Sequence, residues 1–475
     1  MTQDKSIRRI KSGFFDRGLS LTKLAIQSGA KFAHGSLKGA LSDPLNKELH
    51  LKAMMTGQAQ LLVRELGQLK GSLMKVGQML ALYGEHFLPE EVVSSLKTLN
   101  DQSPPVQWSE IEKILRKRLH QDILDELEID TQALAAASMG QVHKARIKAS
   151  GEWICLKIQY PGVDTAIDSD IKALRSLLSM FKFIPTHSEG YEELFQEIRE
   201  MLMRELNYEQ ELRFTDLAAL RLAADQKFIV PRVFPRYSCH HLLATSFEEG
   251  ISLDSAEVAA LSSERRSRLG IAFARLFLLE LFHFKMMQTD PHFGNYRVRL
   301  KENGDDQLIL LDWGAVQEFK DHFLEHYKNM ILGAIHADSE RVIQSGIGIG
   351  FLREDDHEKL KKCFVELAYI AIEPWLPPRD PRVPSHLVDS KGCYMWARSD
   401  LPSRVATMAT KYALSFKMRP PPRDILFLDR KIGGVFIVLK ILDARFQGHK
   451  LLEEELLQHW GERFPREIRW PTEQL

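Results

Sequence analysis

The sequence predicts an α+β protein in which a small β-containing part lies between two helical parts of the chain. Three observations lead to this prediction. Helix-forming residues dominate from about residue 46 to 99 and again over most of the chain beyond residue 248. Between them, residues 141–147 and 153–158 read as two strands joined by a short Ser150-Gly151 turn, which is typical of a β-hairpin. An apolar segment at 307–311 predicts one further strand within the second helical part.

The other predicted elements follow from local start and stop signals. A break at Ser103-Pro104-Pro105 ends the first helical part. Helices are then expected at 108–119, 164–182 and 191–223, a strand at 242–247, and Pro-rich irregular stretches at 375–384 and 420–422. These signals divide the chain into a basic segment (1–45), a helical extension (46–125), a β-containing lobe (126–247) and a helical lobe with an insert (248–475).

Composition narrows the function classes. The 475 residues are 44% hydrophobic and 27% charged, so neither a disordered nor a membrane-embedded chain is favoured. Lys+Arg and Asp+Glu both number 64, so no overall positive field draws the molecule to nucleic acid. The four cysteines lack the close spacing of a disulfide framework or a zinc site. No secretory signal or bilayer-spanning stretch is recognised, and we expect a reducing, cytoplasmic location.

The basic segment leaves two interpretations open. Residues 5–40 interleave Lys and Arg with apolar side chains such as Phe14, Phe15 and Leu19. This pattern suits an amphipathic helix on anionic lipid, which would make the protein peripheral at the inner membrane. It equally suits a solvated helix that packs its apolar face on its own protein.

The strongest local signal is a pair of motifs in a fixed order. Asp290 is followed five residues later by Asn295, which matches the spacing of a kinase catalytic loop. Asp312-Trp313-Gly314, directly after the strand at 307–311, matches the metal-binding motif of such proteins. Asn295 and Asp312 are oxygen ligands suited to Mg²⁺, and Asp290 can orient an attacking hydroxyl or water. A capped loop and an unrelated turn are the alternative.

A lysine within the hairpin supplies the expected phosphate contact. Lys157 lies among Ile154, Cys155, Leu156 and Ile158, where an unpaired ammonium group would be costly. The segment 201–211 offers Glu205 and Glu211 as partners. On one helix these two carboxylates would project about 120° apart and serve different groups. Glu211 is the favoured partner of Lys157, with Glu205 second.

A loop of small residues precedes the hairpin. Small side chains let backbone N–H groups approach phosphate, although alanine restricts the backbone more than glycine does. Glu248, directly after the strand at 242–247, is predicted as a further nucleotide contact. The predicted nucleotide-binding residues of the loop are Ala135, Ala136, Ala137, Ser138, Met139 and Gly140.

Taken together, these motifs closely resemble the UbiB family of atypical kinases, also called AarF-like. The similarity covers about residues 60–450 and includes Lys157-Ile158-Gln159-Tyr160-Pro161-Gly162-Val163. It also includes Lys75-Val76-Gly77-Gln78, which looks like the family's Lys-x-Gly-Gln motif in the helical extension. The resemblance implies a two-lobed protein-kinase-like fold.

The resemblance also implies an activity. Family members bind ATP or ADP with Mg²⁺, show ATPase activity and support ubiquinone biosynthesis at a membrane, so an isoprenoid-lipid intermediate and quinone-biosynthesis proteins are the implied partners. By analogy, Lys75 and Gln78 reach into the site, with Lys75 near Glu205. Asn207 departs from the family, which commonly has Asp there. A phosphotransferase acting on a small-molecule or protein hydroxyl and a nucleotide-sensing scaffold remain alternatives.

Overall fold

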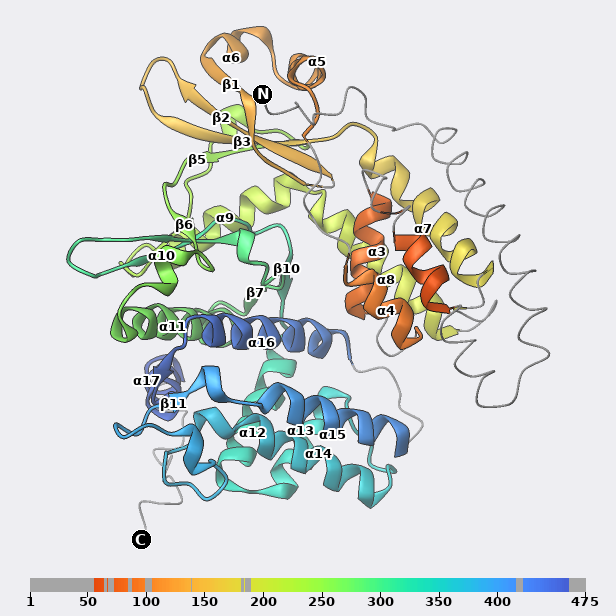
Figure 1. Ribbon diagram of the computed structural model, residues 1–475, viewed down its shortest axis with the longest axis vertical. Coiled ribbons are helices and arrows are strands. Elements are labelled where there is room, and N and C mark those ends of the chain that lie inside the picture. The colour runs from red at the N-terminus through yellow and green to blue at the C-terminus, as the bar shows by residue number, and fades with distance from the viewer. Residues whose placement is uncertain are drawn as a thin grey trace. The chain divides into compact units, whose positions relative to one another are not determined.

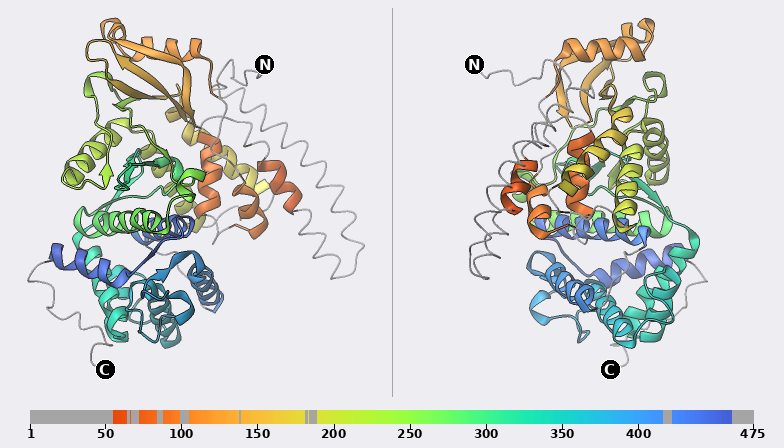
Figure 2. Two further views of the ribbon diagram at one scale, coloured as in Figure 1. Left: turned by 60° about the vertical axis from the view of Figure 1, so that its left-hand side comes forward. Right: turned by 90° about the vertical axis from the view of Figure 1, so that its right-hand side faces the viewer.

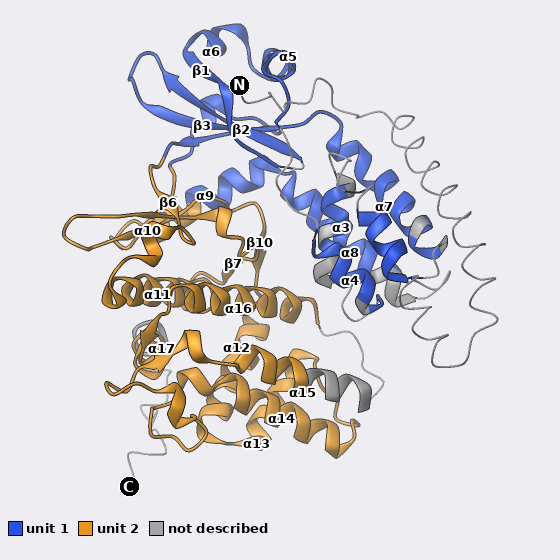
Figure 3. Cartoon of the chain, in the orientation of Figure 1, with its two compact units in different colours: residues 1–216, 232–247 blue, residues 217–231, 248–475 orange. Residues whose placement is uncertain are grey.

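A computed structural model gives the fold of the chain (Figure 1). It describes residues 55–63, 66, 72–83, 88–98, 105–137, 139–180, 183, 189–415 and 422–460. The basic segment 1–45 therefore lies outside the described residues. The chain forms two compact units (Figure 3): unit 1 comprises 1–216 with 232–247, and unit 2 comprises 217–231 with 248–475.

Three helices of unit 1 pack against α3, the helix of the Lys-x-Gly-Gln motif. α3 packs against α4, α7 and α8. Val76 and Leu80 lie four residues apart on one face of α3 and are completely buried, which gives this helix its contact surface. The helices are α3 (Ser72–Tyr83), α4 (Glu90–Leu96), α5 (Trp108–Arg118), α6 (Gln121–Asp125), α7 (Val163–Met180), α8 (Glu189–Glu205) and α9 (Tyr208–Leu222).

The sheet of unit 1 confirms the predicted hairpin and adds a strand. Its order is β1-β2-β3-β5, with antiparallel neighbours throughout. The strands are β1 (Leu127–Ala136), β2 (Gly140–Ile147), β3 (Trp153–Gln159) and β5 (Leu242–Ser246). The prediction of a loop at Ala135 and Ala136 is wrong, because these residues end β1 and pair with Val142 and Gln141. Most of β1 is exposed, so it lacks the apolar alternation that reveals a half-buried strand.

The single helix predicted at 191–223 is also wrong. α8 ends at Glu205 and α9 begins at Tyr208, with Leu206 and Asn207 between them. Apolar side chains continue across this break, among them Leu202, Leu206 and Phe214, so hydrophobic periodicity does not reveal it.

The described part of unit 2 contains three small sheets, and its strand β9 confirms the strand predicted at 307–311. The first sheet has the order β4-β9-β8-β6, and the second pairs β7 with β10. The third pairs β11 with β12 and lies among the C-terminal helices. The strands are β4 (Phe228–Ile229), β6 (Ile251–Ser252), β7 (Met286–Gln288), β8 (Tyr296–Arg299), β9 (Gln307–Leu310), β10 (Val316–Glu318), β11 (Tyr394–Met395) and β12 (Arg445–Phe446).

Helices make up most of the rest of unit 2. α16 lies along α11 in both views, and the two helices are in contact (Figures 1 and 2). α11 continues into a π-helical turn, η3 (Leu279–His283), a geometry that often marks functional sites. None of the helices in the described parts of the chain is long and apolar enough to cross a bilayer. The helices are α10 (Ala256–Ala259), α11 (Ser263–Leu278), α12 (Asp321–His336), α13 (Ser339–Ile349), α14 (Glu358–Ala371), α15 (Leu401–Ser415), α16 (Arg423–Ile441) and α17 (Gly448–Trp460).

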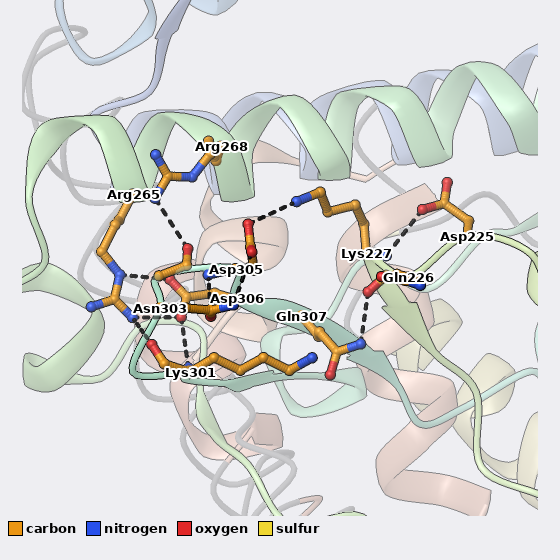
Figure 4. A network of polar contacts seen from close by, with 11 residues as sticks. Asp225, Gln226, Lys227, Arg265, Arg268, Lys301, Asn303, Asp305, Asp306 and Gln307 are labelled. Atoms are coloured by element: carbon orange, nitrogen blue, oxygen red, sulfur yellow. Dashed lines mark hydrogen bonds and ion pairs between the residues drawn. The ribbon is translucent and has the colours of Figure 1, made fainter.

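A polar network fixes the β8–β9 hairpin to α11 (Figure 4). The guanidinium of Arg265 binds the carboxylate of Asp306 through two contacts of 2.8 and 2.5 Å. One turn further along α11, Arg268 donates to the carbonyl of Gly304 at 3.0 Å. Gly304 has φ +79°, which glycine adopts without strain at the hairpin turn. These contacts hold β8, the strand that directly follows Asn295.

Candidate active site

The Asp290 loop and the Asp312 motif lie side by side in unit 2. β7 and β10 pair in antiparallel register, with Gln288 opposite Val316. Thr289 N donates to Ala315 O at 2.8 Å and extends this pairing, while Leu311 N donates to Asn295 O at 2.9 Å and extends the pairing of β8 with β9. The pairing of short strands therefore brings two segments about 20 residues apart into one loop cluster.

Side chains fix the geometry of this cluster. Asn295 Nδ2 donates to the carbonyl oxygen of Asp290 at 2.9 Å and to its Oδ2 at 3.2 Å. Because Nδ2 is the atom bound to Asp290, the amide oxygen is the atom that remains for a cation. Asp312 Oδ1 accepts from Gly314 N at 2.8 Å, and Trp313 between them is 1% exposed and anchors the motif in the core.

A residue that the sequence analysis missed holds the other oxygen of Asp290. Arg430 Nη2 lies 2.5 Å from Asp290 Oδ1, and both side chains are partly exposed. Arg430 belongs to α16, which also contacts the loop at Gly434: a Cβ built there would lie 2.1 Å from Cβ of Pro291. No local motif marks Arg430, because 140 residues separate it from Asp290.

A buried polar cluster lies beneath the loop. Lys431 Nζ pairs with Glu280 Oε2 at 2.7 Å, and each side chain is 1% exposed. Tyr296 Oη donates to Gln288 Oε1 at 3.2 Å and lies 3.5 Å from Lys431 Nζ. Burial raises the pKa of Glu280, and the Lys431 charge opposes this shift. Burial, followed by the negative charges of Glu280, Asp290 and Asp312, raises the pKa of Tyr296 well above its ordinary value.

The predicted ion pair between Lys157 and a glutamate lies in unit 1. Lys157 Nζ lies 2.7 and 2.9 Å from the two carboxylate oxygens of Glu211, so the favoured ion pair is present. Glu211 is 2% exposed while Lys157 retains 28% exposure, which places the carboxylate inside and the ammonium towards solvent. The ammonium also lies 5.2 Å from the ring centre of Tyr208.

The second carboxylate serves a different lysine. Glu205 Oε1 lies 2.9 Å from Lys75 Nζ on α3, as the family resemblance implied. The side chain of Gln78 lies outside the described residues. The role of Lys75 and Gln78 in an active site remains a prediction.

The small-residue loop is shorter than expected. Ala137 N donates to Gly140 O at 2.9 Å, which closes a tight turn between β1 and β2. A Cβ at Gly140 would lie 2.6 Å from the backbone oxygen of Ile158, so this position requires glycine. Met139 is buried, and Ser138 lies outside the described residues. Glu248, in unit 2, pairs with Arg299 at 2.8 Å, and its contact with a nucleotide remains a prediction.

Gln141, directly after this turn, has all its amide hydrogen bonds satisfied in the core. Its Oε1 accepts from Val106 N at 2.8 Å and from Tyr160 Oη at 2.9 Å. Its Nε2 donates to Val106 O at 3.3 Å and contacts His143 Nε2 at 2.7 Å. His143 Nδ1 faces the carbonyl of Asp130 at 2.8 Å, so Nδ1 carries the proton and Nε2 accepts. This network ties the turn to the segment that enters the sheet.

The residues present fit a magnesium-bound triphosphate. Among the described residues, no three His, Cys, Asp or Glu side chains gather to hold a metal by themselves. Mg²⁺ typically takes one or two protein oxygen ligands and completes its shell with phosphate oxygens and water. Asn295 and Asp312 are ligands of this kind, and Lys157 is a cation suited to phosphate. Their convergence on one triphosphate remains a prediction.

Comparisons with known proteins agree with the motifs. The chain is 28% identical over 449 residues to the mitochondrial atypical kinase COQ8B of Rattus norvegicus, covering 94% of this chain and 79% of the relative. It is 26% identical to the mitochondrial atypical kinase COQ8 of Schizosaccharomyces pombe, covering 85% of this chain and 63% of that relative. For the Saccharomyces cerevisiae COQ8, the identity is 27% and the shares are 83% and 75%.

The fold and the family follow from two further matches. The solved complex of Rv3197 with erythromycin from Mycobacterium tuberculosis matches with a TM-score of 0.56 at 23% identity, covering 86% of this chain and 98% of that one. This likeness supports the protein-kinase-like α+β fold. The model of the ABC1 atypical kinase-like domain matches residues 98–346, more than half of the chain. The family predicted from the motifs is thereby confirmed: the chain belongs to the ABC1 atypical kinase-like family.

Proposed function

We propose that this protein binds ATP with Mg²⁺ and turns it over as an atypical kinase or ATPase that supports ubiquinone or other isoprenoid-lipid metabolism. The observation that carries the proposal is the loop cluster of unit 2, in which Asp290, Asn295 and the Asp312 motif lie side by side. Membership of a kinase-like family supports the same nucleotide chemistry.

Each site residue has a role that its surroundings support. Magnesium, when bound, would neutralise phosphate charge and orient the transferred group. Asn295 and Asp312 would hold it through oxygen atoms. Lys157, oriented by Glu211, would contact the phosphates from the sheet of unit 1. Asp290 would orient the attacking oxygen.

The contacts of Asp290 fix the orientation of its carboxylate. Both of its carboxylate oxygens accept hydrogen bonds from the protein, one from Arg430 and one from Asn295. A carboxylate held in this way has a fixed orientation, which suits the positioning of a small nucleophile. Transfer to a small-molecule or protein hydroxyl is the second candidate. Robust transfer of labelled γ-phosphate to an acceptor would favour it over ATP hydrolysis.

The nucleotide part of the proposal is tested by thermal shift. Wild-type protein should gain stability from ATP only when Mg²⁺ is present, because bound ligand stabilises the folded state. Asp312→Asn should lose this Mg²⁺-dependent gain while keeping the melting temperature of the ligand-free protein. An unchanged gain in the variant would exclude Asp312 as a metal ligand.

The pathway is tested by quinone profiling. A strain that lacks the protein should accumulate less ubiquinone, wild-type protein should restore it, and Asp290→Asn should not. A normal quinone profile without the protein would remove the pathway and leave the kinase-like fold in place.

Contact with a membrane surface is a separate part of the proposal, supported by the basic amphipathic sequence at 5–40. Deletion of residues 1–40 should reduce co-sedimentation with anionic liposomes. Equal binding by the truncated protein would leave the packing of this segment on its own protein as the better interpretation.

A further inference from the structure

The break between α8 and α9 is built from specific hydrogen bonds. Leu206 and Asn207 are the two residues between the helices, and we refer to them as the joint. A helix break leaves carbonyl groups at the end of the first helix and N–H groups at the start of the second without helical partners. At the joint, side chains satisfy groups on both sides.

Asn207 caps the start of α9. Its Oδ1 accepts from Gln210 N at 3.0 Å, and its backbone carbonyl accepts from Glu211 N, also at 3.0 Å. This is the N-cap arrangement, for which asparagine is among the preferred residues. The residue whose backbone N–H binds Asn207 is Glu211, the partner of Lys157.

Gln159 fixes the other side of the joint. Its Nε2 donates to the carbonyl oxygen of Leu206 at 2.9 Å, and its Oε1 lies 2.6 Å from His241 Nδ1. Gln159 is 1% exposed and belongs to β3, two residues after Lys157. The strand that carries Lys157 is thus bonded directly to the joint.

The joint separates two ion pairs that one straight helix would place differently. Glu205 ends α8 and pairs with Lys75, while Glu211 lies in the first turn of α9 and pairs with Lys157. Tyr208, the first residue of α9, is 4% exposed, and its hydroxyl lies 3.2 Å from the position that a Cβ on Gly140 would take. The first turn of α9 therefore lies against both β3, which carries Lys157, and the β1–β2 turn at Gly140.

We propose that Asn207 is a positioning residue: as the N-cap of α9 it fixes the turn that carries Glu211, and through Glu211 it sets the position of Lys157. The inference rests on the proposed nucleotide function for its ligand readout. It assigns the Asn207 side chain to helix capping and not to metal binding or to charge pairing with Lys75.

Three substitutions at one position separate these roles. Serine and aspartate are both good N-caps, whereas alanine is a poor one. Serine keeps a capping oxygen but is shorter and has neither a carbonyl oxygen nor a charge, so it replaces the cap but neither a carbonyl ligand nor a charge partner. We expect Asn207→Ala to weaken MgATP binding about three- to tenfold, and Asn207→Ser and Asn207→Asp to remain within about twofold of wild type.

The cap itself is measured without nucleotide. Hydrogen exchange of a peptide covering residues 208–214 should speed up in Asn207→Ala, because the Gln210 amide loses its acceptor, and should stay slow in Asn207→Ser. Asp338→Ala is the matched control, since Asp338 caps α13 through an equivalent 3.0 Å bond from Arg341 N. This control should speed exchange in α13 and leave MgATP binding unchanged.

The outcomes distinguish the inference from the proposed function. If Asn207→Ser binds MgATP as weakly as Asn207→Ala while Asn207→Asp binds more tightly, the side chain acts as a ligand or charge partner and the inference is overturned. If Asn207→Ala speeds exchange but binds MgATP like wild type, the cap exists without positioning Lys157, which also overturns it. Wild-type protein that binds no nucleotide would instead overturn the proposed function, and the exchange data would still decide the cap.

Discussion

The two units pair the charges of their predicted site residues in opposite ways. In unit 1 each site cation is held by a carboxylate: Lys157 by Glu211 and Lys75 by Glu205. In unit 2 a site carboxylate, Asp290, is held by a cation, Arg430. A magnesium-bound triphosphate needs both arrangements, because the phosphates require positive charge and the metal requires oxygen atoms. In each unit the paired group offsets the charge of the predicted site residue beside it.

The two units also differ in how deeply the charged side chains of their ion pairs are buried. The ammonium of Lys157 retains 28% exposure above the buried Glu211. Unit 2 has a second layer, in which Lys431 and Glu280 are both 1% exposed beneath the Asp290 loop. A fully buried pair costs much desolvation, so it contributes more to a unique arrangement of its neighbours than to net stability. We therefore expect the buried Lys431–Glu280 pair to fix the position of the Asp290 loop.

The largest effect on stability is expected from breaking the buried Lys431–Glu280 ion pair. Lys431→Met leaves the buried Glu280 without its partner, and should lower the free energy of unfolding by about 3–5 kcal/mol in urea titrations. Lys157→Met should cost less although Glu211 is also buried, because the exposed side of this pair lets water replace the lost ammonium group.

A double variant provides the control. Lys431→Met with Glu280→Leu removes both charges and should recover most of the lost stability. If the double variant is as unstable as Lys431→Met, packing rather than the unpaired carboxylate causes the loss. If the double variant recovers stability but not ATP turnover, the Lys431–Glu280 pair is needed to position the Asp290 loop.

The sequence predicted those site residues that sit in linear motifs. Asp290, Asn295 and Asp312 lie within short motifs, and Lys157 was recognised as a lysine inside an apolar strand. The same reasoning applies to Lys431, which precedes Ile432-Gly433-Gly434-Val435 and also requires an anionic partner. Its partner could not be predicted in this way, because Glu280 belongs to a distant segment brought close only by the packing of α16 on α11.

Tertiary contacts explain the errors in secondary structure as well. The break after Glu205 depends on Gln159, a residue of β3 that binds the Leu206 carbonyl. Asn207 is a cap signal that can be read from sequence, but here it lies within a continuous apolar pattern that predicts helix. The pairing of β7 with β10 could not be foreseen, because strands of three residues carry too little periodicity.

The next prediction uses two adjacent glycines of α16. A Cβ at Gly434 would lie 2.1 Å from Pro291, whereas a Cβ at Gly433 would meet nothing within 4 Å. Gly434→Ala should therefore destabilise unit 2 by about 1–3 kcal/mol and displace the Asp290 loop. Gly433→Ala should stabilise it by about 0.5–1 kcal/mol, because alanine favours the helix.

Paired measurements of unfolding and MgATP binding decide this point. Gly434→Ala should lose both stability and affinity, and Gly433→Ala should keep its affinity. Equal behaviour of the two variants would show that α16 does not set the position of the loop. Unit 1 offers the parallel at Gly140, whose absent side chain admits the Ile158 backbone.

The smallest expected effect is a dependence of stability on pH in unit 1. The core of this unit near the β1–β2 turn contains the buried histidine His143, whereas unit 2 buries the ion pair of Lys431 with Glu280. Burial lowers the pKa of His143 below its ordinary value of 6.5. Between the two values the unfolded chain binds the extra proton, so stability is lost as the pH falls below about 6.5 and is regained as it rises. Protonated Nε2 would face the donor Nε2 of Gln141, which explains the sign structurally. We expect the strands of unit 1 to lose stability between pH 7 and 5, measured by hydrogen exchange, and His143→Gln to flatten this dependence. An equal slope in the variant would assign the loss to other groups, such as His241, whose pKa is also lowered by burial.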